Sequence, residues 1–181
     1  PIRCLEIIYG SLFDNKHFFR YDREIIHSYD GENLALDWGS LHAKFEDKNQ
    51  DLSKVPIVVL LPGLSGSSNA SYIKATMNKL RSGGFRPVVF NSRGSGVPQI
   101  SDNIFDYRYT EKDLQVALDH VHQKYPKANI YFMGFSYGSS YGTNVFSENQ
   151  DLVKGMVCVA NPFNMYKAGE SLNSRWNRVY S

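Results

Sequence analysis

Residues Asn129–Gly142 read NIYFMGFSYGSSYG, and the fold class follows from this stretch. The apolar run Ile130–Met133 predicts a strand, and the residues after Ser136 are compatible with a helix. Because Ser136 stands between Gly134 and Gly138, the stretch has the G-x-S-x-G pattern of a nucleophile elbow, a sharp strand-to-helix turn that exposes a serine hydroxyl. We expect glycine at both positions because strand and helix pass so close together that side chains would collide.

The backbone after the serine fits the chemistry of ester cleavage. Tyr137 N–H would lie at the N-terminus of the predicted helix, where unpaired N–H groups favour negative charge. This suits the oxyanion that forms when a serine attacks an ester. The alternative is a glycine-rich turn without chemistry, but the strand and helix on either side favour a nucleophile.

Three more short apolar runs predict buried strands, at residues 55–61, 87–90 and 153–160. Apolar residues with helical spacing predict helices around residues 73–80 and 114–125. Strands that alternate with helices indicate an α/β fold, with helices on both faces of a mostly parallel sheet. Near the N-terminus, Asp30-Gly31 between alternating apolar residues predicts a hairpin, which would add antiparallel strands at one edge. At this length we expect residues 1–181 to belong to a single domain.

The loop after the strand at 55–61 is predicted to supply a second oxyanion donor. In a nucleophile-elbow enzyme, one donor follows the nucleophile and another comes from the loop after an earlier strand. Pro62-Gly63-Leu64 holds that place, so Leu64 N–H is the candidate. An ordinary strand-to-helix loop is the alternative.

Five polar residues are candidates for local structural roles. Ser68 or Asn69 is a candidate N-cap for the helix around 73–80. Thr110, with Asp113 three residues later, resembles a capping box at the start of the next helix. Arg93, in the loop after the strand at 87–90, is interpreted as a hydrogen-bonded structural arginine.

Composition excludes several classes of protein. The net charge of +2 is too small to indicate a nucleic-acid partner, and the longest apolar runs are far shorter than a membrane span. Two cysteines are too few for a disulfide framework, and Cys158, in an apolar run, is predicted to be a buried free thiol. The first residue is Pro1, so the sequence leaves open whether a signal or anchor precedes it. The choice between a cytoplasmic and a membrane-associated location is therefore open as well.

No cofactor or metal is expected. Gly94 and Gly96 match the start of a dinucleotide fingerprint, but its third glycine would fall on Gln99. His120 and His122 are two residues apart on a predicted helix, so they do not face each other as a metal-binding pair would.

Several stretches together resemble the AB hydrolase 4 family of the α/β-hydrolase superfamily, which are serine hydrolases of lipid esters. The stretches that carry the resemblance are Leu36-Asp37-Trp38, residues 61–67, residues 89–96, Tyr125-Pro126, residues 134–139 and residues 161–164. The resemblance implies esterase or lipase activity on acylglycerols, phospholipids or medium-chain fatty-acid esters. It also implies that Ser136 is the nucleophile and that Leu64 and Tyr137 form the oxyanion hole. Residues 162–181 are similar to the start of the cap over the acyl pocket, with apolar Phe163, Met165 and Tyr166.

The positions of the histidines in this chain depart from the pattern of the family. A serine hydroxyl needs a base, normally a histidine held by a carboxylate, and in this superfamily both follow the serine. All five histidines of this chain precede Ser136. We therefore expect an N-terminal portion of a hydrolase that lacks the C-terminal strands, the acid and the base, and that is inactive by itself.

Two classes of function follow from these observations. The first is a serine hydrolase of lipid esters, with a small-molecule substrate, no nucleic-acid partner, and a membrane surface and oligomeric state left open. The second is a non-catalytic relative that binds lipid or another protein on the same scaffold. The intact elbow favours the first, because a non-catalytic protein has no chemical reason to keep serine between those glycines.

Overall fold

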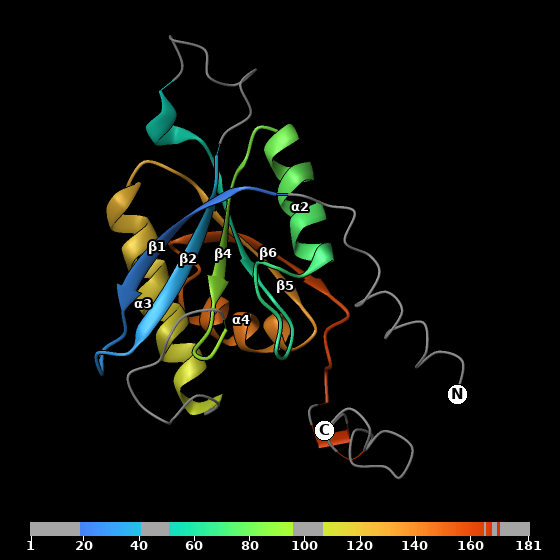
Figure 1. Cartoon of the computed structure of the whole chain (residues 1–181). Coiled ribbons are helices and arrows are strands. Elements are labelled where there is room, and N and C mark those ends of the chain that lie inside the picture. Colours follow the sequence, from blue (N-terminus) through green and yellow to red (C-terminus); the bar gives the residue numbers. More distant parts are fainter. Residues whose placement is uncertain (1–18, 41–50, 96–106, 165, 168–169, 171–181) are drawn as a thin grey trace.

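The structure is a computed structural model that describes residues 19–40, 51–95, 107–164, 166, 167 and 170. Gln99, Met165 and most of the predicted cap start therefore lie outside the described residues. Within the described part, six strands form one sheet in the order β1-β2-β4-β3-β5-β6 (Figure 1). The strands are β1 (Tyr21–His27), β2 (Asn33–Gly39), β3 (Ile57–Leu61), β4 (Arg86–Asn91), β5 (Ile130–Phe135) and β6 (Val153–Val159). The helices are α2 (Ser71–Ser82), α3 (Tyr107–Lys124) and α4 (Tyr137–Glu148), with a 3₁₀ turn, η2, at Leu52–Lys54.

The sheet confirms the predicted α/β class. Strands β4, β3, β5 and β6 run parallel to one another. The hairpin β1–β2 is antiparallel and joins the sheet through β4, so β1 forms one edge, as predicted. The turn contains Gly31 at φ +88°, a conformation that a residue without a Cβ adopts readily.

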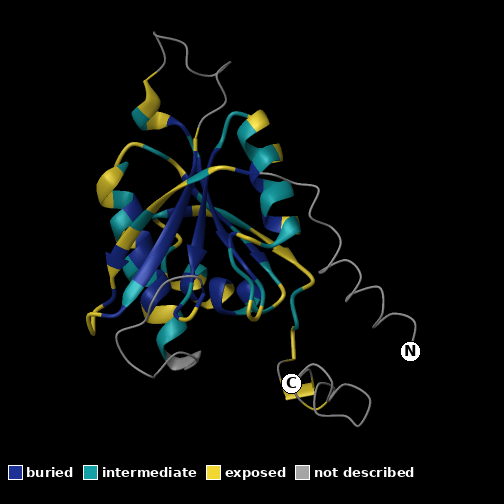
Figure 2. Cartoon of the chain, in the orientation of Figure 1, coloured by how far each residue is buried: buried dark blue, intermediate teal, exposed yellow. Residues whose placement is uncertain are grey.

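Helices cover both faces of the sheet, with α2 on one face and α3 and α4 on the other (Figure 1). Alternate residues of β3 therefore enter two different cores. Ile57, Val59 and Leu61 pack in the core with α3 and α4, whereas Val58 and Leu60 pack in the core with α2. This is why β3 is a continuous apolar run and is buried along its whole length (Figure 2).

The predicted helix caps are wrong. The N-cap of α2 is Ala70, whose methyl side chain cannot form a cap hydrogen bond, and the Ser68 hydroxyl donates instead to Asp37. Asn69 accepts a hydrogen bond from Tyr21 Oη at 3.2 Å. Thr110 lies inside α3, which begins three residues earlier, and Asp113 is buried in contact with other elements.

Strand β6 pairs with β5 and is the last strand of the described sheet. Its second half is open, with Val157 55% and Val159 37% exposed. Cys158 is likewise an exposed free thiol, so the prediction of a buried thiol is wrong. An apolar run marks a strand but does not determine the strand's place in the sheet order.

None of the helices in the described residues has both the length and the apolar character that a membrane crossing requires.

Candidate active site

Ser136 occupies the turn between β5 and α4. The strand ends at Phe135, the helix begins at Tyr137, and Ser136 between them has φ +50° and ψ −118°. A non-glycine residue in this region is strained, and such strain persists where the surrounding structure imposes it. The side chain is exposed, and in the described part of the chain the hydroxyl makes no hydrogen bond. The geometry is that of a strand-to-helix turn that presents a serine hydroxyl outward.

The two flanking glycines are sterically required, as predicted. A Cβ on Gly134 would lie 2.6 Å from Ser139 Cα in α4. A Cβ on Gly138 would lie 2.0 Å from Leu61 O at the end of β3. Both obstacles are backbone atoms, which cannot move aside as a flexible side chain would. The G-x-S-x-G spacing therefore lets β3, β5 and α4 approach one another at this point.

Replacing Gly138 with alanine should lower the free energy of unfolding by about 3 kcal/mol or more, because the new methyl group would force α4 away from β3. Urea unfolding of the purified variant measures this change. Gly155→Ala in β6 is the matched control, since its Cβ would approach no atom closer than 3.7 Å. That variant should shift the same free energy by less than about 1 kcal/mol. Equal stability of the two variants would contradict the steric explanation.

The loop after β3 lies against the elbow. A Cβ on Gly63 would be 3.4 Å from Ser136 Cβ and 3.3 Å from Phe135 O, so this backbone passes directly beside the serine. The next residue, Leu64, has a 66% exposed side chain, and its N–H makes no hydrogen bond with any described residue. Tyr137 is the first residue of α4 and follows the serine directly. The fold thus brings the predicted site residues Ser136, Leu64 and Tyr137 to one place.

Tyr72, near the start of α2, is a neighbour of the site that the sequence did not indicate. Its hydroxyl accepts a hydrogen bond from Gly63 N–H at 3.2 Å, and its ring lies 5.0 Å from the ring of Phe135. Burial raises the pKa of the Tyr72 hydroxyl, against the opposing effect of the Gly63 hydrogen bond. The side chain is therefore neutral near pH 7 and fixes the position of the loop. A tyrosine on an amphipathic helix carries no local signal for this role.

The end of β6 holds the elbow from the other side. Val159 O accepts hydrogen bonds from Ser136 N–H at 2.8 Å and from Ser139 Oγ at 3.3 Å. Asn161 Oδ1 accepts one from Ser140 Oγ at 3.0 Å. The turn is thereby fixed by two parallel neighbours of β5, namely β3 through steric contact and β6 through hydrogen bonds.

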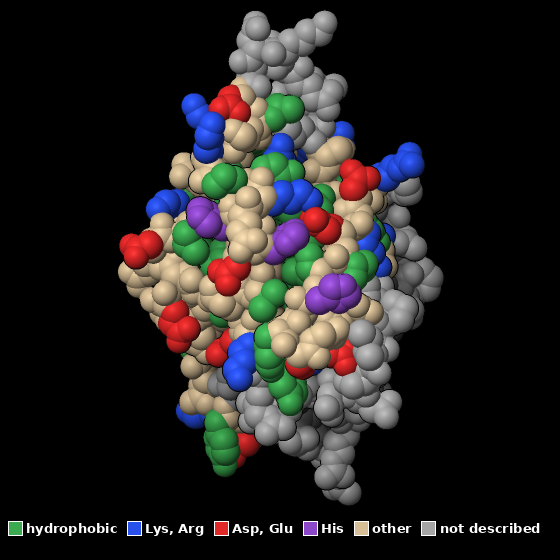
Figure 3. All heavy atoms as spheres, turned by 90° about the vertical axis from the view of Figure 1, so that its left-hand side faces the viewer, with side chains coloured by type: hydrophobic (Ala, Val, Ile, Leu, Met, Phe, Trp, Pro, Cys, Tyr) green, Lys and Arg blue, Asp and Glu red, His purple; other side chains and the backbone are tan. Residues whose placement is uncertain are grey.

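No histidine in the described part of the chain contacts Ser136. His120 on α3 lies 3.1 Å from Glu24 Oε1, and Glu24 also accepts a hydrogen bond from Lys124 at 2.8 Å. Figure 3 shows the face of the molecule on which histidine, acidic and basic side chains are interspersed, on the side of β1 and α3. His17 and His42 lie outside the described residues. Within the described residues, no three His, Cys, Asp or Glu side chains are grouped as metal ligands would be.

Arg93 is a structural arginine, as predicted. Its guanidinium is 5% exposed and contacts the fully buried Asp113 at 2.6 Å and Asp30 at 2.7 Å. Ser28 also bonds to Asp113 and Arg93. The hydrogen bond to Asp113 raises the pKa of Arg93 further above its ordinary value, although burial acts in the opposite direction. The same arginine lowers the pKa of the Asp30 carboxyl through a hydrogen bond. These contacts tie the hairpin, the loop after β4 and α3 together.

Comparison with known proteins agrees with this geometry. A family model described as alpha/beta hydrolase fold matches residues 56–181. The embryogenesis-associated protein EMB8 of Picea glauca is 32% identical, over 98% of this chain and 40% of its own length. Phospholipase ABHD3 of Bos taurus is 32% identical, over 90% of this chain and 40% of its own length. The monoacylglycerol lipase of Saccharomyces cerevisiae is 26% identical, over 98% of this chain and 48% of its own length. The chain thus spans less than half the length of these curated relatives.

Solved structures with low sequence identity share the fold. The esterase Pf2001 of Pyrococcus furiosus has a TM-score of 0.68 at 21% identity, over 84% of this chain and 53% of its own. An alpha-beta serine hydrolase homologue from Coxiella burnetii has a TM-score of 0.63 at 23% identity, over 83% of this chain and 67% of its own. The family model covers most of the sequence, and the sheet and elbow have the expected arrangement. The chain belongs to the alpha/beta hydrolase fold family.

Proposed function

We propose that this chain carries the nucleophile and the oxyanion hole of a serine hydrolase that cleaves carboxylic esters of lipids. The observation that carries the proposal is Ser136, exposed at positive φ between β5 and α4, with the backbone of Gly63 and Leu64 beside it. Relatives named phospholipase and monoacylglycerol lipase support an ester of a lipid as the substrate class. A hydrolase activity of this kind is consistent with the family.

The proposed reaction proceeds through an acyl-enzyme. Ser136 Oγ attacks the ester carbonyl carbon while a base removes the hydroxyl proton, and the carbonyl oxygen becomes an oxyanion. Leu64 N–H and Tyr137 N–H would donate hydrogen bonds to that oxyanion, with the N-terminal end of α4 favouring its negative charge. Collapse of the intermediate breaks the ester C–O bond, and the leaving alcohol takes the proton from the base while the acyl group stays on Ser136. Water, activated by the same base, then releases the fatty acid and restores the serine.

Apolar residues that follow β6 support an acyl chain as part of the substrate. Phe163 is 94% and Tyr166 77% exposed, beyond the strand whose end contacts the elbow. In our proposal residues 1–181 belong to one domain, and residues 162–181 begin a cap over the acyl chain. Burying such side chains against an acyl chain would contribute about 25 cal/mol for each Å² of apolar surface removed from water.

An ester chain-length series tests this function. The longest natural polypeptide that contains these residues should hydrolyse p-nitrophenyl esters, and kcat/KM should rise from acetyl to medium or long acyl chains. A peptide p-nitroanilide is the matched control and should not be cleaved. Cleavage of the anilide without ester turnover would contradict the proposal. Absence of any turnover, together with absence of fluorophosphonate labelling, would favour the non-catalytic alternative.

A further inference from the structure

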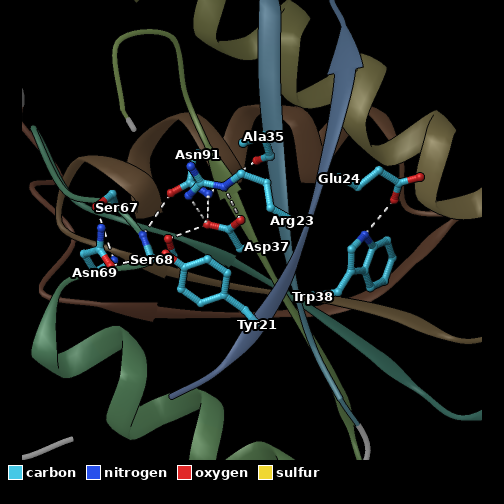
Figure 4. A network of polar contacts seen from close by, with 10 residues as sticks. All are labelled: Tyr21, Arg23, Glu24, Ala35, Asp37, Trp38, Ser67, Ser68, Asn69 and Asn91. Atoms are coloured by element: carbon cyan, nitrogen blue, oxygen red, sulfur yellow. Dashed lines mark hydrogen bonds and ion pairs between the residues drawn. The ribbon is translucent and has the colours of Figure 1, made fainter. Parts of the chain in front are cut away.

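A buried carboxylate on β2 connects the hairpin to the loop beside Ser136 (Figure 4). Asp37 is 0% exposed and accepts two hydrogen bonds from Arg23, from Nε and from Nη2, each at 2.7 Å. It also accepts one from Asn91 Nδ2 at 2.9 Å and one from the hydroxyl of Ser68. A buried charge is costly unless it is paired and hydrogen-bonded, and both Asp37 oxygens have such partners.

Ser68 is the point at which this network reaches the loop. It is fully buried, its hydroxyl donates to Asp37, and its backbone N–H donates to Asn91 Oδ1 at 2.9 Å. Neither bond serves the helix that follows, since Ala70 is the N-cap of α2. The loop is therefore attached at Ser68 to two neighbouring strands, β2 through Asp37 and β4 through Asn91.

The other end of the same loop has its own anchor. Gly63 N–H donates to Tyr72 Oη at 3.2 Å, and Gly66 N–H donates to Gly63 O at 2.9 Å. Leu64 lies between Gly63 and Ser68, so both anchors restrict the position of its N–H. An oxyanion donor must lie within about 2.7–3.1 Å of the developing charge, and a misplacement of about 1 Å can lower a rate on the order of 10²-fold.

We propose that Asp37 is a positioning residue of the active site, which acts through Ser68 and Asn91 to hold Leu64 N–H in place for the oxyanion. This role rests on the proposed function, because it presumes that Ser136 attacks an ester. The network joins the loop by short, directional hydrogen bonds to a charged group, which fix geometry more narrowly than apolar contact does. Stability alone would not require these hydrogen bonds, because replacing a buried ion pair with well-packed apolar residues often leaves a protein equally stable.

The Arg93–Asp113 pair provides an internal comparison. It has the same chemistry, a fully buried aspartate with a bidentate arginine, but its partners are Ser28 and Asp30, not the loop beside Ser136. Loss of either aspartate should lower stability, whereas only loss of Asp37 should change the chemical step.

The first test replaces Ser68 with alanine. Ser68→Ala should lower kcat for a p-nitrophenyl ester at least about tenfold, with KM little changed, because a hydrogen bond to a charged group is lost where the transition state needs it. Ser67→Ala is the matched control: among the described residues, Ser67 Oγ has one hydrogen bond, which it accepts from Asn69 N–H at 3.3 Å on the exposed side of the loop. That variant should keep both constants. An unchanged kcat in folded Ser68→Ala would overturn the positioning role.

A second pair of variants separates positioning from stability. Asp37→Asn should lower kcat on the order of 10²-fold and slow fluorophosphonate labelling of Ser136, whereas Asp113→Asn should keep kcat and lose only stability in urea. A normal kcat in Asp37→Asn at temperatures where it is folded would overturn the proposal. If Asp37→Asn does not fold, the kcat of Ser68→Ala decides whether the network positions the loop. An inactive, unlabelled wild type would instead overturn the proposed function and the positioning role with it.

Discussion

Alanine in place of Ser136 is expected to lower kcat for a lipid ester on the order of 10⁶-fold, the scale of loss when a serine hydrolase loses its nucleophile. In the proposed mechanism Ser136 Oγ forms the bond to the acyl carbon, and alanine has no atom that can do so. Folding should be retained, because the side chain is exposed and makes no cap hydrogen bond to α4. The measurement is ester turnover together with fluorophosphonate labelling, in the longest natural polypeptide that contains these residues.

Ser147→Ala is the control for this experiment. Ser147 lies on α4, the helix that follows the elbow, and in the described part of the chain its hydroxyl makes one hydrogen bond, to Asn144 O at 2.7 Å on the exposed surface. The variant should keep both turnover and labelling. If the probe labels Ser136→Ala as strongly as it labels the wild type, the nucleophile is another residue. If the ester turnover of the variant is also unchanged, Ser136 has no part in the mechanism.

The part of the fold that sequence predicts well depends on local patterns. The elbow could be predicted because glycine is sterically required on both sides of Ser136, and a Cβ at position 138 would lie 2.0 Å from Leu61 O. The hairpin could be predicted because Asp30-Gly31 precedes the alternating residues Leu34, Leu36 and Trp38, and Gly31 adopts positive φ between β1 and β2. Strand β3 could be predicted because helices on both faces require an uninterrupted apolar run.

The failures share one feature, which is that the outcome depends on the tertiary structure and not on the local pattern. Ser68 and Thr110 have the residue types of helix N-caps, yet Ser68 bonds to Asp37, 31 positions earlier, and Thr110 lies within α3. Local pattern shows that a serine can cap a helix, but not that a buried carboxylate elsewhere will bind it. Cys158 fails for a similar reason, since its exposure depends on the order of strands in the sheet.

The contacts that Tyr72 and Asp37 make with the loop beside Ser136 could not be predicted from the sequence. Tyr72 contacts Gly63 from helix α2, and Asp37 contacts Ser68 from the hairpin. In the sequence, Tyr72 is one aromatic residue on an amphipathic helix, and Asp37 is one acidic residue between Leu36 and Trp38. The contacts of Asp37 arise only when the sheet order places β2 beside β4, which brings Asp37 next to Asn91.

The second large effect concerns stability. Asp113→Ala is expected to lower the free energy of unfolding by about 3–5 kcal/mol, because it leaves the buried guanidinium of Arg93 without its main partner. Asp30 cannot compensate fully, since its side chain is 32% exposed and already bonds to the other side of the same guanidinium. Ser28, which bonds to Asp113, would lose a partner as well. Urea unfolding followed by circular dichroism measures the change.

Two further variants show whether the loss arises from the unpaired charge. Asp119→Ala, on the same helix but exposed and bonded only to Gln115 among the described contacts, should change the free energy by no more than about 0.5 kcal/mol. The double variant Arg93→Met with Asp113→Leu should recover much of the loss, because two apolar side chains remove the buried charge together with its partner. If the double variant is as unstable as Asp113→Ala, the network stabilises the fold through its specific hydrogen bonds between the hairpin, the loop after β4 and α3, and not by neutralising a buried cation.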